Sequence, residues 1–415
     1  MSLLSRLARP IVRSRLAQLR RGSIRLRDGS DVVSGGDASG GALVITVHDP
    51  RFYTAVAFGG AVGAGEAYAE GWWSADDLTG IVRLLLRNRD VLDGLETGLA
   101  RAAQPLRLLL HALNANSRRG SLRNIRAHYD LGNDFFGLFL DETMTYSCGV
   151  FSRPGASLAE ASEAKYARVA ALLALEPGDR VVEIGGGWGA FALYAAGRHG
   201  CRVTTTTLSE EQFAFVGRRV ADAGLSDRIT VLRQDYRDLR GTFDKLASIE
   251  MIEAVGHEHY ETYYRCCARL LGPRGRAVIQ AITIADERYE TARREVDFIK
   301  RHIFPGSCIP SRAVLARAAS RTDLRLVQAD EIGLHYAETL SRWRRRLAAN
   351  GDRAARLGFD ARFRRLWEYY FCYCEGGFLE RAIGAAQLLY AKPAASVALP
   401  LGVAAVPPAP AEIAA

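Results

Sequence analysis

The sequence predicts an α/β fold in which a Rossmann-like parallel sheet carries helices on both faces. Two observations lead to this prediction. From about residue 158 onward, helical and strand patterns alternate at the spacing of βαβ units. In addition, the apolar strand Arg180–Ile184 runs into the glycine-rich turn Gly185–Gly189 directly before a helical pattern. Such a turn is typical of a nucleotide-cofactor site, because glycine permits the tight reversal and lets a ligand lie against the backbone.

The first 115 residues predict a separate, smaller α+β domain, here called domain 1–115. Residues Ile24–Val47 alternate polar and apolar side chains between glycine-rich breaks, as short strands do. Phe52–Trp73 is rich in glycine and aromatic residues, and Leu78–Leu113 has the apolar periodicity of a helix. The polar segment Asn114–Gly120 predicts a joint to the next domain.

The second domain is expected to span residues 116–392, and residues 393–415, a Pro/Ala/Val segment with little to bury, are expected to be disordered. Ligands of such folds bind beyond the carboxyl ends of the strands, so the site is expected there. The expected elements are helix Leu158–Leu175, strand Arg180–Ile184, helix Gly189–His199, strand Arg202–Thr206, helix Glu210–Ala223, strand Ile229–Arg233 and strand Phe243–Ile249.

The composition is that of a globular protein of two or three domains, with 415 residues, 48% hydrophobic and 24% charged. No run approaches about 18 consecutive apolar residues, so neither a transmembrane helix nor an export signal is expected. The cysteines include no Cys-x-x-Cys pair, and His257 and His259 lack the His-Glu-x-x-His spacing. No disulfide framework and no metal site is therefore expected, and a reducing cytoplasm is the expected location.

The formal charge of +9 is concentrated in part at the N-terminus, where arginines alternate with Leu and Ile. A basic amphipathic stretch can lie on an anionic membrane surface, although a solvated helix face or an arm packed on its own domain remains an equal alternative. A nucleic-acid partner is not expected, since no recognition motif accompanies the charge. The arginines are Arg6, Arg9, Arg13, Arg15, Arg20, Arg21, Arg25 and Arg27.

The residues around the glycine turn favour a methyl donor over a nicotinamide cofactor. Gly185, Gly187 and Ala190 fit the dinucleotide fingerprint, which requires an acidic residue about 20 positions later for a ribose hydroxyl. The next strand ends instead in the four threonines Thr204–Thr207. Glu183, just before the turn, can attract a cationic amine or sulfonium group, as in S-adenosylmethionine.

Several further motifs, in order along nearly the whole chain, carry a resemblance. They are GGAVGAGEAYAEGWW (Gly59–Trp73), HYDLGNDFF (His128–Phe136), MTYSC (Met144–Cys148), VEIGGGWG (Val182–Gly189), TLSEEQ (Thr207–Gln212), DYRDL (Asp235–Leu239), EMIEAVG (Glu250–Gly256) and DFIKRHIFPGSCIPS (Asp297–Ser311). With these motifs the chain resembles cyclopropane-fatty-acyl-phospholipid synthases, mycolic-acid cyclopropane synthases and related fatty-acid C-methyltransferases.

The resemblance implies a seven-stranded class I methyltransferase sheet behind an N-terminal lipid-associated domain. It also implies an enzyme that transfers the methyl group of S-adenosylmethionine to the cis double bond of an unsaturated acyl chain in a phospholipid bilayer, at the cytoplasmic face of a membrane. Together with Glu183, the cofactor contacts implied by the matching motifs are Tyr146, Ser147, Gly185, Gly187, Gly189, Thr207, Leu208, Gln212, Gln234 and Asp235.

The second half of the reaction needs a base, because methyl transfer to an alkene leaves a carbocation that must lose a proton. In the family this base is bicarbonate, and its ligands correspond here to Cys148, Glu253, Tyr336 and the backbone of Ile282. A histidine usually completes the set, whereas this chain has Gln280. Glutamine can still donate and accept hydrogen bonds, so bicarbonate remains the expected second cofactor.

Two alternatives to a cyclopropane synthase stay open. If the cation undergoes a hydride shift before the proton is lost, the product is a methylene-branched chain, which a reductase could convert to a methyl-branched one. The chain could also be a peripheral membrane-binding protein without catalysis, a hypothesis that the intact Cys148, Glu253 and Tyr336 disfavour. A homodimer would help a peripheral enzyme to hold the bilayer through two weak contacts.

Overall fold

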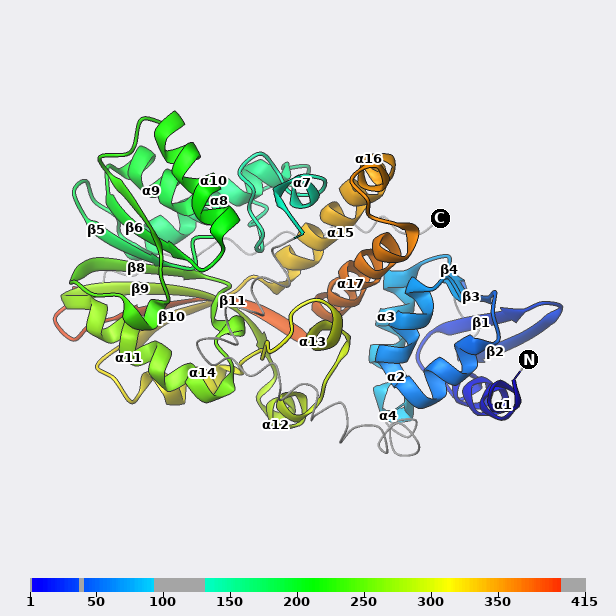
Figure 1. Cartoon of the computed structure of the whole chain (residues 1–415). Helices are drawn as coiled ribbons and strands as arrows, with labels where there is room; N and C mark the ends of the chain where they lie inside the picture. The colour runs from blue at the N-terminus through cyan, green and yellow to red at the C-terminus, as the bar shows by residue number, and fades with distance from the viewer. Residues whose placement is uncertain (1, 37–40, 93–130, 397–415) are drawn as a thin grey trace. The chain divides into compact units, whose positions relative to one another are not determined.

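The computed structural model describes residues 2–36, 41–92 and 131–396 and divides the chain into two compact units (Figure 1). Unit 1 contains Met1–Asn114, Arg294–Pro305 and Leu340–Ala382, and unit 2 contains Ala115–Arg293, Gly306–Thr339 and Ile383–Ala415. The second and third segments of unit 1 lie within the range 116–392 that the sequence analysis gave to one catalytic domain. They pack with unit 1 because the aromatic helix in 361–379 buries its side chains there.

Unit 1 is built on a four-stranded sheet with the order β2-β1-β3-β4. The alternating segment from residue 24 to 47 forms strands, as predicted, whereas the glycine-rich segment after it forms a helix with a kink at Gly60, where φ is +56°. The elements are α1 (Leu3–Ala17), β1 (Ser23–Asp28), β2 (Asp31–Gly36), β3 (Leu43–Val47), α2 (Arg51–Ala69), β4 (Trp73–Ala75), α3 (Leu78–Arg87) and α4 (Arg89–Leu92).

The periodic segment predicted as a helix from residue 78 to 113 is broken at Asn88, which caps α3. Its continuation over residues 93–113, the joint at 114–120 and the terminal residues 397–415 lie outside the described residues. Among the described residues, no helix combines the length and apolar character that crossing a membrane requires.

The later segments add α13 (Phe298–His302), α16 (Gly351–Arg356) and α17 (Ala361–Leu379) to unit 1, and α15 (Gly333–Ala349) begins in unit 2 and ends in unit 1. Helix α17 packs against α2 and α3. A side chain on Gly65 of α2 would lie 2.5 Å from the ring of Phe298, which itself lies 4.7 Å from the ring of Tyr369. This close approach explains why the segment of α2 is rich in small residues.

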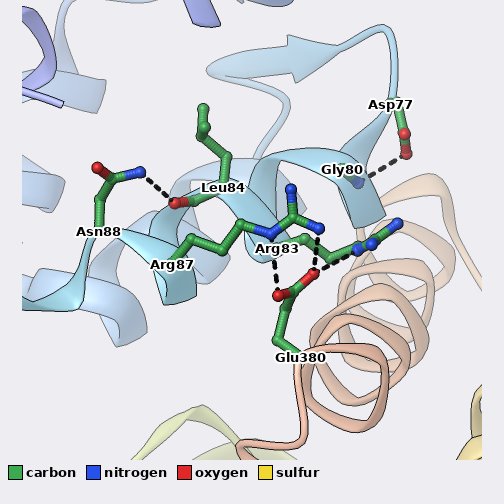
Figure 2. A network of polar contacts seen from close by, with 7 residues as sticks. All are labelled: Asp77, Gly80, Arg83, Leu84, Arg87, Asn88 and Glu380. Atoms are coloured by element: carbon green, nitrogen blue, oxygen red, sulfur yellow. Dashed lines mark hydrogen bonds and ion pairs between the residues drawn. The ribbon is translucent and has the colours of Figure 1, made fainter. Parts of the chain in front are cut away.

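Polar contacts reinforce the packing of α3 on α17, as Figure 2 shows. Glu380, which caps the C-terminus of α17, accepts hydrogen bonds from Arg83 Nε at 2.7 Å and from Arg87 Nε and Nη2 at 2.9 and 2.7 Å. At the two ends of α3, Asp77 caps the first turn and the Asn88 amide donates to a carbonyl of the last turn. The helix is therefore fixed at both ends and along its side.

Unit 2 contains the predicted seven-stranded sheet, with the order β10-β11-β9-β8-β5-β6-β7. The strands from β9 to β7 pair in parallel, but β11 runs antiparallel between β9 and β10, which the prediction of a parallel sheet did not include. The strands are β5 (Arg180–Ile184), β6 (Arg202–Thr207), β7 (Ile229–Arg233), β8 (Phe243–Ile249), β9 (Leu271–Ile284), β10 (Arg325–Glu331) and β11 (Ile383–Ala391).

Helices cover both faces of this sheet, as predicted (Figure 1). Neighbouring residues of one strand, such as Val181 and Val182 of β5, face opposite sides, and so do Val278 and Ile279 of β9. One face packs against α8, α9 and α10 and the other against α11 and α14. The helices are α7 (Asn133–Phe136), α8 (Leu158–Leu173), α9 (Ala190–His199), α10 (Glu210–Asp222), α11 (Tyr260–Leu270), α12 (Asp286–Arg294) and α14 (Arg312–Ala319).

Candidate active site

A cavity opens at the carboxyl ends of β5, β6 and β8, where ligands of parallel sheets bind. All of the predicted cofactor contacts except Gly189 lie on its wall. Those that line it are Tyr146, Ser147, Glu183, Gly185, Gly187, Thr207, Leu208, Gln212, Gln234 and Asp235. The structure therefore brings together residues from four separate motifs of the sequence.

The glycine turn needs its glycines for two different reasons. A Cβ atom on Gly186 would lie 1.9 Å from the Thr205 hydroxyl oxygen, so a side chain cannot fit between β5 and β6. Gly189 has φ +82° and a Cβ atom there would lie 2.7 Å from Val216, while its N–H donates to the Gly186 carbonyl at 2.8 Å. Gly189 thus shapes the turn from behind and does not itself line the cavity.

Glu183 places a buried carboxyl on the cavity wall, with an exposed fraction of 2%. Burial raises its pKa to about 7, and the hydrogen bond that it accepts from the Thr205 hydroxyl at 2.5 Å opposes this rise. A cation in the cavity would favour the ionised form of this carboxyl. The site is therefore suited to a ligand that carries a positive charge.

Thr207 and Gln212 form a polar pair where a dinucleotide site would have an acidic residue. The Thr207 hydroxyl donates to Gln212 Oε1 at 2.8 Å, which directs the amide nitrogen away from the threonine. Within the described part of the chain, that buried Nε2 atom has no hydrogen-bond partner. An unsatisfied buried donor on a cavity wall fits a ligand hydroxyl such as those of a ribose.

Asp235 is held rigidly rather than left mobile at the cavity. Arg237 donates from Nε to Oδ1 at 2.9 Å and from Nη2 to Oδ2 at 2.6 Å, the two-pronged geometry of a strong carboxylate pair. Asp235 also accepts from the Arg237 backbone N–H at 2.9 Å. The neighbouring Gln234 lies on the same wall.

Aromatic rings close another side of the cavity. Trp188, within the glycine turn, has its ring 4.9 Å from that of Phe136, and its Nε1 donates to Asn133 at 2.6 Å. The Phe136 ring in turn lies 5.3 Å from Tyr146, which lines the cavity together with Trp188. Trp188 is not among the predicted site residues, although a large aromatic ring inside a glycine-rich turn is a sequence signal for a ligand site.

Three of the predicted bicarbonate ligands, Cys148, Gln280 and Tyr336, converge on a carboxylate of the chain itself, Glu250. Its Oε1 accepts from the Cys148 N–H at 2.9 Å and from Gln280 Nε2 at 2.7 Å, and its Oε2 accepts from the Tyr336 hydroxyl at 2.6 Å. Gln387 donates to Gln280 Oε1 at 2.9 Å and so turns the Gln280 amide nitrogen toward Glu250. Glu250 belongs to the motif Glu250–Gly256 but is not among the predicted site residues.

Glu250 directly follows β8 and adopts a left-handed conformation with φ +50°. Such a conformation costs a non-glycine residue about 1 kcal/mol or more and concentrates at functional sites. Its N–H donates to the Gln280 carbonyl at 2.8 Å, and its side chain lines the cavity. Burial raises the pKa of this carboxyl, and the bonds from Tyr336, the Cys148 N–H and Gln280 oppose that rise.

Glu253 lies one turn further on and has a different environment. One of its oxygens accepts from the Ile282 N–H at 2.5 Å, and the other is buried without a partner among the described residues. Burial, with repulsion from Glu250, raises the pKa of Glu253 to about 8. The two carboxyls therefore differ: three hydrogen bonds favour the charged form of Glu250, whereas burial and the charge of Glu250 favour the protonated form of Glu253.

A buried lysine on α8 completes the charge pattern. Lys165 donates from Nζ to the Ser147 hydroxyl at 2.7 Å. Burial lowers its pKa to about 8, and the negative charge of Glu250 opposes that shift. Cys148, by contrast, remains a thiol because burial raises its pKa well above the ordinary value, so its contribution is the backbone N–H rather than a nucleophilic sulfur.

The sequence is similar to those of several known proteins. Residues 116–388 match a family model described as mycolic acid cyclopropane synthetase. Tuberculostearic acid methyltransferase of Mycobacterium tuberculosis is 38% identical over 362 residues, which cover 84% of this chain and 83% of that protein. Cyclopropane-fatty-acyl-phospholipid synthase of Escherichia coli K12 is 34% identical over 353 residues, which cover 84% of this chain and 87% of that protein.

Solved structures give the same result for the fold. The cyclopropane synthase MmaA2 from Mycobacterium tuberculosis matches 65% of this chain and 98% of its own, with 28% identity and a TM-score of 0.62. A mycolic acid cyclopropane synthase solved with SAH and CTAB has the same coverage and TM-score, with 32% identity. The chain is thus similar to these proteins over 65% of its length.

Proposed function

Because the chain belongs to the mycolic acid cyclopropane synthetase family, we propose that it converts a cis double bond in a phospholipid acyl chain to a cyclopropane. Family membership makes it a methyltransferase that uses S-adenosylmethionine and acts on unsaturated lipids. The phospholipid substrate and the cyclopropane product go beyond what family membership shows, and they form the proposal. The observation that carries it is the cavity at the end of the sheet, where one wall suits the methyl donor and Glu250 stands at another.

The residues of this cavity fit S-adenosylmethionine, which when bound supplies an electrophilic methyl group on a positively charged sulfur. Glu183 offers a buried carboxyl to the cationic part of the molecule. The unpaired Gln212 amide offers a donor to a ribose hydroxyl, and the bare backbone of Gly185 and Gly187 allows close approach. These residues would hold the methyl group in line with the alkene, which provides much of the rate because an isolated alkene is a weak nucleophile.

The site must also exclude water, since water would capture the carbocation that methyl transfer leaves behind. Trp188, Phe136 and Tyr146 supply an apolar boundary, and Cys148 and Lys165 are buried. A base near the cavity must then remove one proton from the newly added methyl carbon. The C–H electron pair forms the third bond of the ring, and no oxidant or reductant is required.

Helix α1 supports association with a membrane surface that would supply the lipid. Leu3, Leu4, Leu7 and Ile11 recur at helical spacing on one face and are 72%, 55%, 61% and 46% exposed. Another side of α1 contains buried residues such as Val12, and α1 packs against α2. An exposed apolar row on a helix rich in arginine fits the interface of an anionic bilayer.

Part of the basic arm has a different partner. Arg9 pairs with Asp28 and Asp31 at 2.7 and 2.8 Å, and Arg13 pairs with Asp31 at 3.3 Å, so these two arginines hold α1 on the sheet of unit 1. Arg6 is exposed on α1 and Arg20 is exposed just beyond its end. The apolar row, more than the count of arginines, is therefore the feature that supports binding to a bilayer.

A methylene-branched or methyl-branched product is the second candidate. It shares the methyl transfer and differs only in a hydride shift before the proton is lost. Two observations favour keeping it: Gln280 stands where the resemblance expects histidine, and one relative is named a methyltransferase rather than a cyclopropane synthase.

The experiment is to incubate the purified protein with S-adenosylmethionine and vesicles of a mono-unsaturated anionic phospholipid, then to release the acyl chains for proton NMR. Strongly upfield ring protons are expected, and vesicles of the saturated lipid serve as the control. Vinylic methylene protons would replace the cyclopropane by the branched product. Acyl chains without an added carbon would contradict the proposed phospholipid substrate.

A further inference from the structure

We propose that Glu250 is the base of the reaction, in the role that the resemblance assigns to bicarbonate. This inference rests on the proposed function, because it concerns the proton that the transferred methyl group loses. It predicts an enzyme whose turnover does not depend on bicarbonate, since the chain supplies the required carboxylate itself.

The residues present do not fit a bound bicarbonate as well as they fit Glu250. A carboxylate and bicarbonate share a planar pair of oxygens with one negative charge, and both need donors directed at that pair. Three of the expected donors, the Cys148 N–H, Gln280 Nε2 and the Tyr336 hydroxyl, already donate to Glu250 at 2.6 to 2.9 Å. The fourth, the Ile282 N–H, donates to Glu253. The anion position is therefore filled by a side chain.

Glu250 has the position that a base needs. Its side chain lies on the wall of the cavity that holds the predicted methyl-donor contacts, so it can meet a group bound there. A carboxylate offers about four acceptor positions, and the described donors fill three of them. One oxygen lone pair thus remains to take a proton.

The neighbouring charges favour Glu250 over Glu253 for this role. Burial and repulsion from Glu250 raise the pKa of Glu253 and favour its protonated form, which is a poor proton acceptor. Glu250 has three hydrogen-bond donors and the buried ammonium group of Lys165 to stabilise its charged form. The backbone of Glu250 is left-handed, a conformation that favours glycine and is strained for other residues. A functional role for the carboxylate at this position would explain why the strain is kept.

The proposed step balances in atoms and electrons. The alkene π pair forms a bond to the methyl carbon while the S–CH₃ pair stays on sulfur, and the second alkene carbon becomes cationic. A Glu250 oxygen then takes one proton from the added methyl group, and the released C–H pair bonds to the cationic carbon and closes the ring. The protonated Glu250 later returns its proton to solvent. After a hydride shift the same proton transfer gives the methylene product, so the inference holds for either ending.

Two variants test the role of the carboxylate. Glu250→Gly removes it and keeps the backbone, because glycine readily adopts φ +50°. Turnover is expected to fall 10²- to 10⁴-fold, the usual contribution of a general base, and added bicarbonate is expected to restore much of it by occupying the vacated donors. Glu250→Gln is expected to lose as much activity without restoration, since its side chain still fills the position.

The measurement compares initial rates in carbonate-free buffer with and without added bicarbonate, on the vesicles described above. Wild type is expected to be unchanged, and Glu258→Gln, which alters an exposed carboxyl outside the cavity, is the matched control. Calorimetric affinity for S-adenosylmethionine within a few-fold of wild type separates loss of the base from loss of the cofactor site.

Two results would overturn the inference while leaving the proposed function intact: a wild-type rate that depends on bicarbonate, or an active Glu250→Gln variant. A wild-type protein that methylates no phospholipid under either condition would contradict the proposed function first, and this inference with it.

Discussion

The exposed row on α1 makes a prediction about membrane binding whose size follows from the structure. Burying a whole leucine side chain is worth about 2 kcal/mol. Leu4 is 55% exposed and Leu7 is 61% exposed, so each can contribute about 1 kcal/mol when the row enters a bilayer interface. The double variant Leu4→Ser/Leu7→Ser is therefore expected to bind vesicles about thirty-fold more weakly, which corresponds to about 2 kcal/mol.

Flotation of the protein with anionic, mono-unsaturated vesicles over a range of lipid concentrations measures this change. Leu357→Ser is the matched control, because Leu357 is 41% exposed in the same unit but lies away from α1, at the end of α16. The control is expected to bind as wild type does. Both altered leucines of α1 are exposed, so the thermal midpoint should not change.

Equal vesicle binding by wild type and the α1 double variant would refute the reasoning. So would an equal loss in the Leu357→Ser control, because the effect would then be general to exposed apolar residues rather than specific to α1.

Three further variants test the site in unit 2. Glu253→Gln is expected to leave turnover and the affinity for S-adenosylmethionine largely intact, because a neutral amide can still accept from the Ile282 N–H, and a loss of turnover would show that Glu253 takes part in the proton transfer. The same variant tests the raised pKa of Glu253. Between about pH 4.3 and 8 the unfolded wild type loses a proton that the folded form keeps. The free energy of unfolding of the wild type should therefore fall relative to that of the variant, by up to about 1.4 kcal/mol for each unit that the pH rises. A constant stability difference across this range in urea titrations would contradict that pKa. Gln212→Ala is expected to weaken S-adenosylmethionine binding about tenfold through the lost donor, and unchanged calorimetric affinity would show that Nε2 has no ligand partner. Gly189→Ala is expected to lower the free energy of unfolding by about 1 to 3 kcal/mol, because of its φ of +82° and the contact with Val216, and an unchanged thermal midpoint would disprove the strain.

The central strands of unit 2 could be predicted almost residue by residue. Strands Arg180–Ile184, Ile229–Arg233 and Phe243–Ile249 have the predicted bounds, because each is a short apolar run between polar or glycine-rich turns. Helix boundaries differ by one or two residues, as at the end of α8, where Ala174 leaves the helix in a left-handed conformation. Local pattern was sufficient wherever an element is bounded by its own turn residues.

Elements whose structure depends on contacts with distant parts of the sequence could not be predicted from local pattern. The segment of α2 has too many glycines to predict a helix, and it is helical because those small residues allow close contact with Phe298 and Tyr369. The antiparallel direction of β11 and the membership of residues 340–382 in unit 1 likewise depend on contacts far apart in the sequence. Hydrophobic periodicity predicts whether a segment is a helix or a strand, but not which other element it packs against.

The residues predicted as cofactor contacts could be placed together from the sequence because they lie within short motifs that fold locally. The side with the carboxylates could not, since Glu250 meets Cys148, Gln280 and Tyr336 only through tertiary structure. The left-handed turn after β8 decides which way its side chain points. Two glutamates three residues apart at the end of a strand were the available signal.

The central claim is tested most directly by following the methyl group of methyl-deuterated S-adenosylmethionine. The protein is incubated with this cofactor and vesicles of a mono-unsaturated anionic phospholipid, and the released acyl chains are analysed by mass spectrometry. We predict one added carbon that keeps two of its three deuterons, because one leaves with the base. An acyl chain that keeps all three deuterons would contradict proton removal from the transferred methyl group, and an unlabelled acyl chain would contradict methyl transfer to the phospholipid.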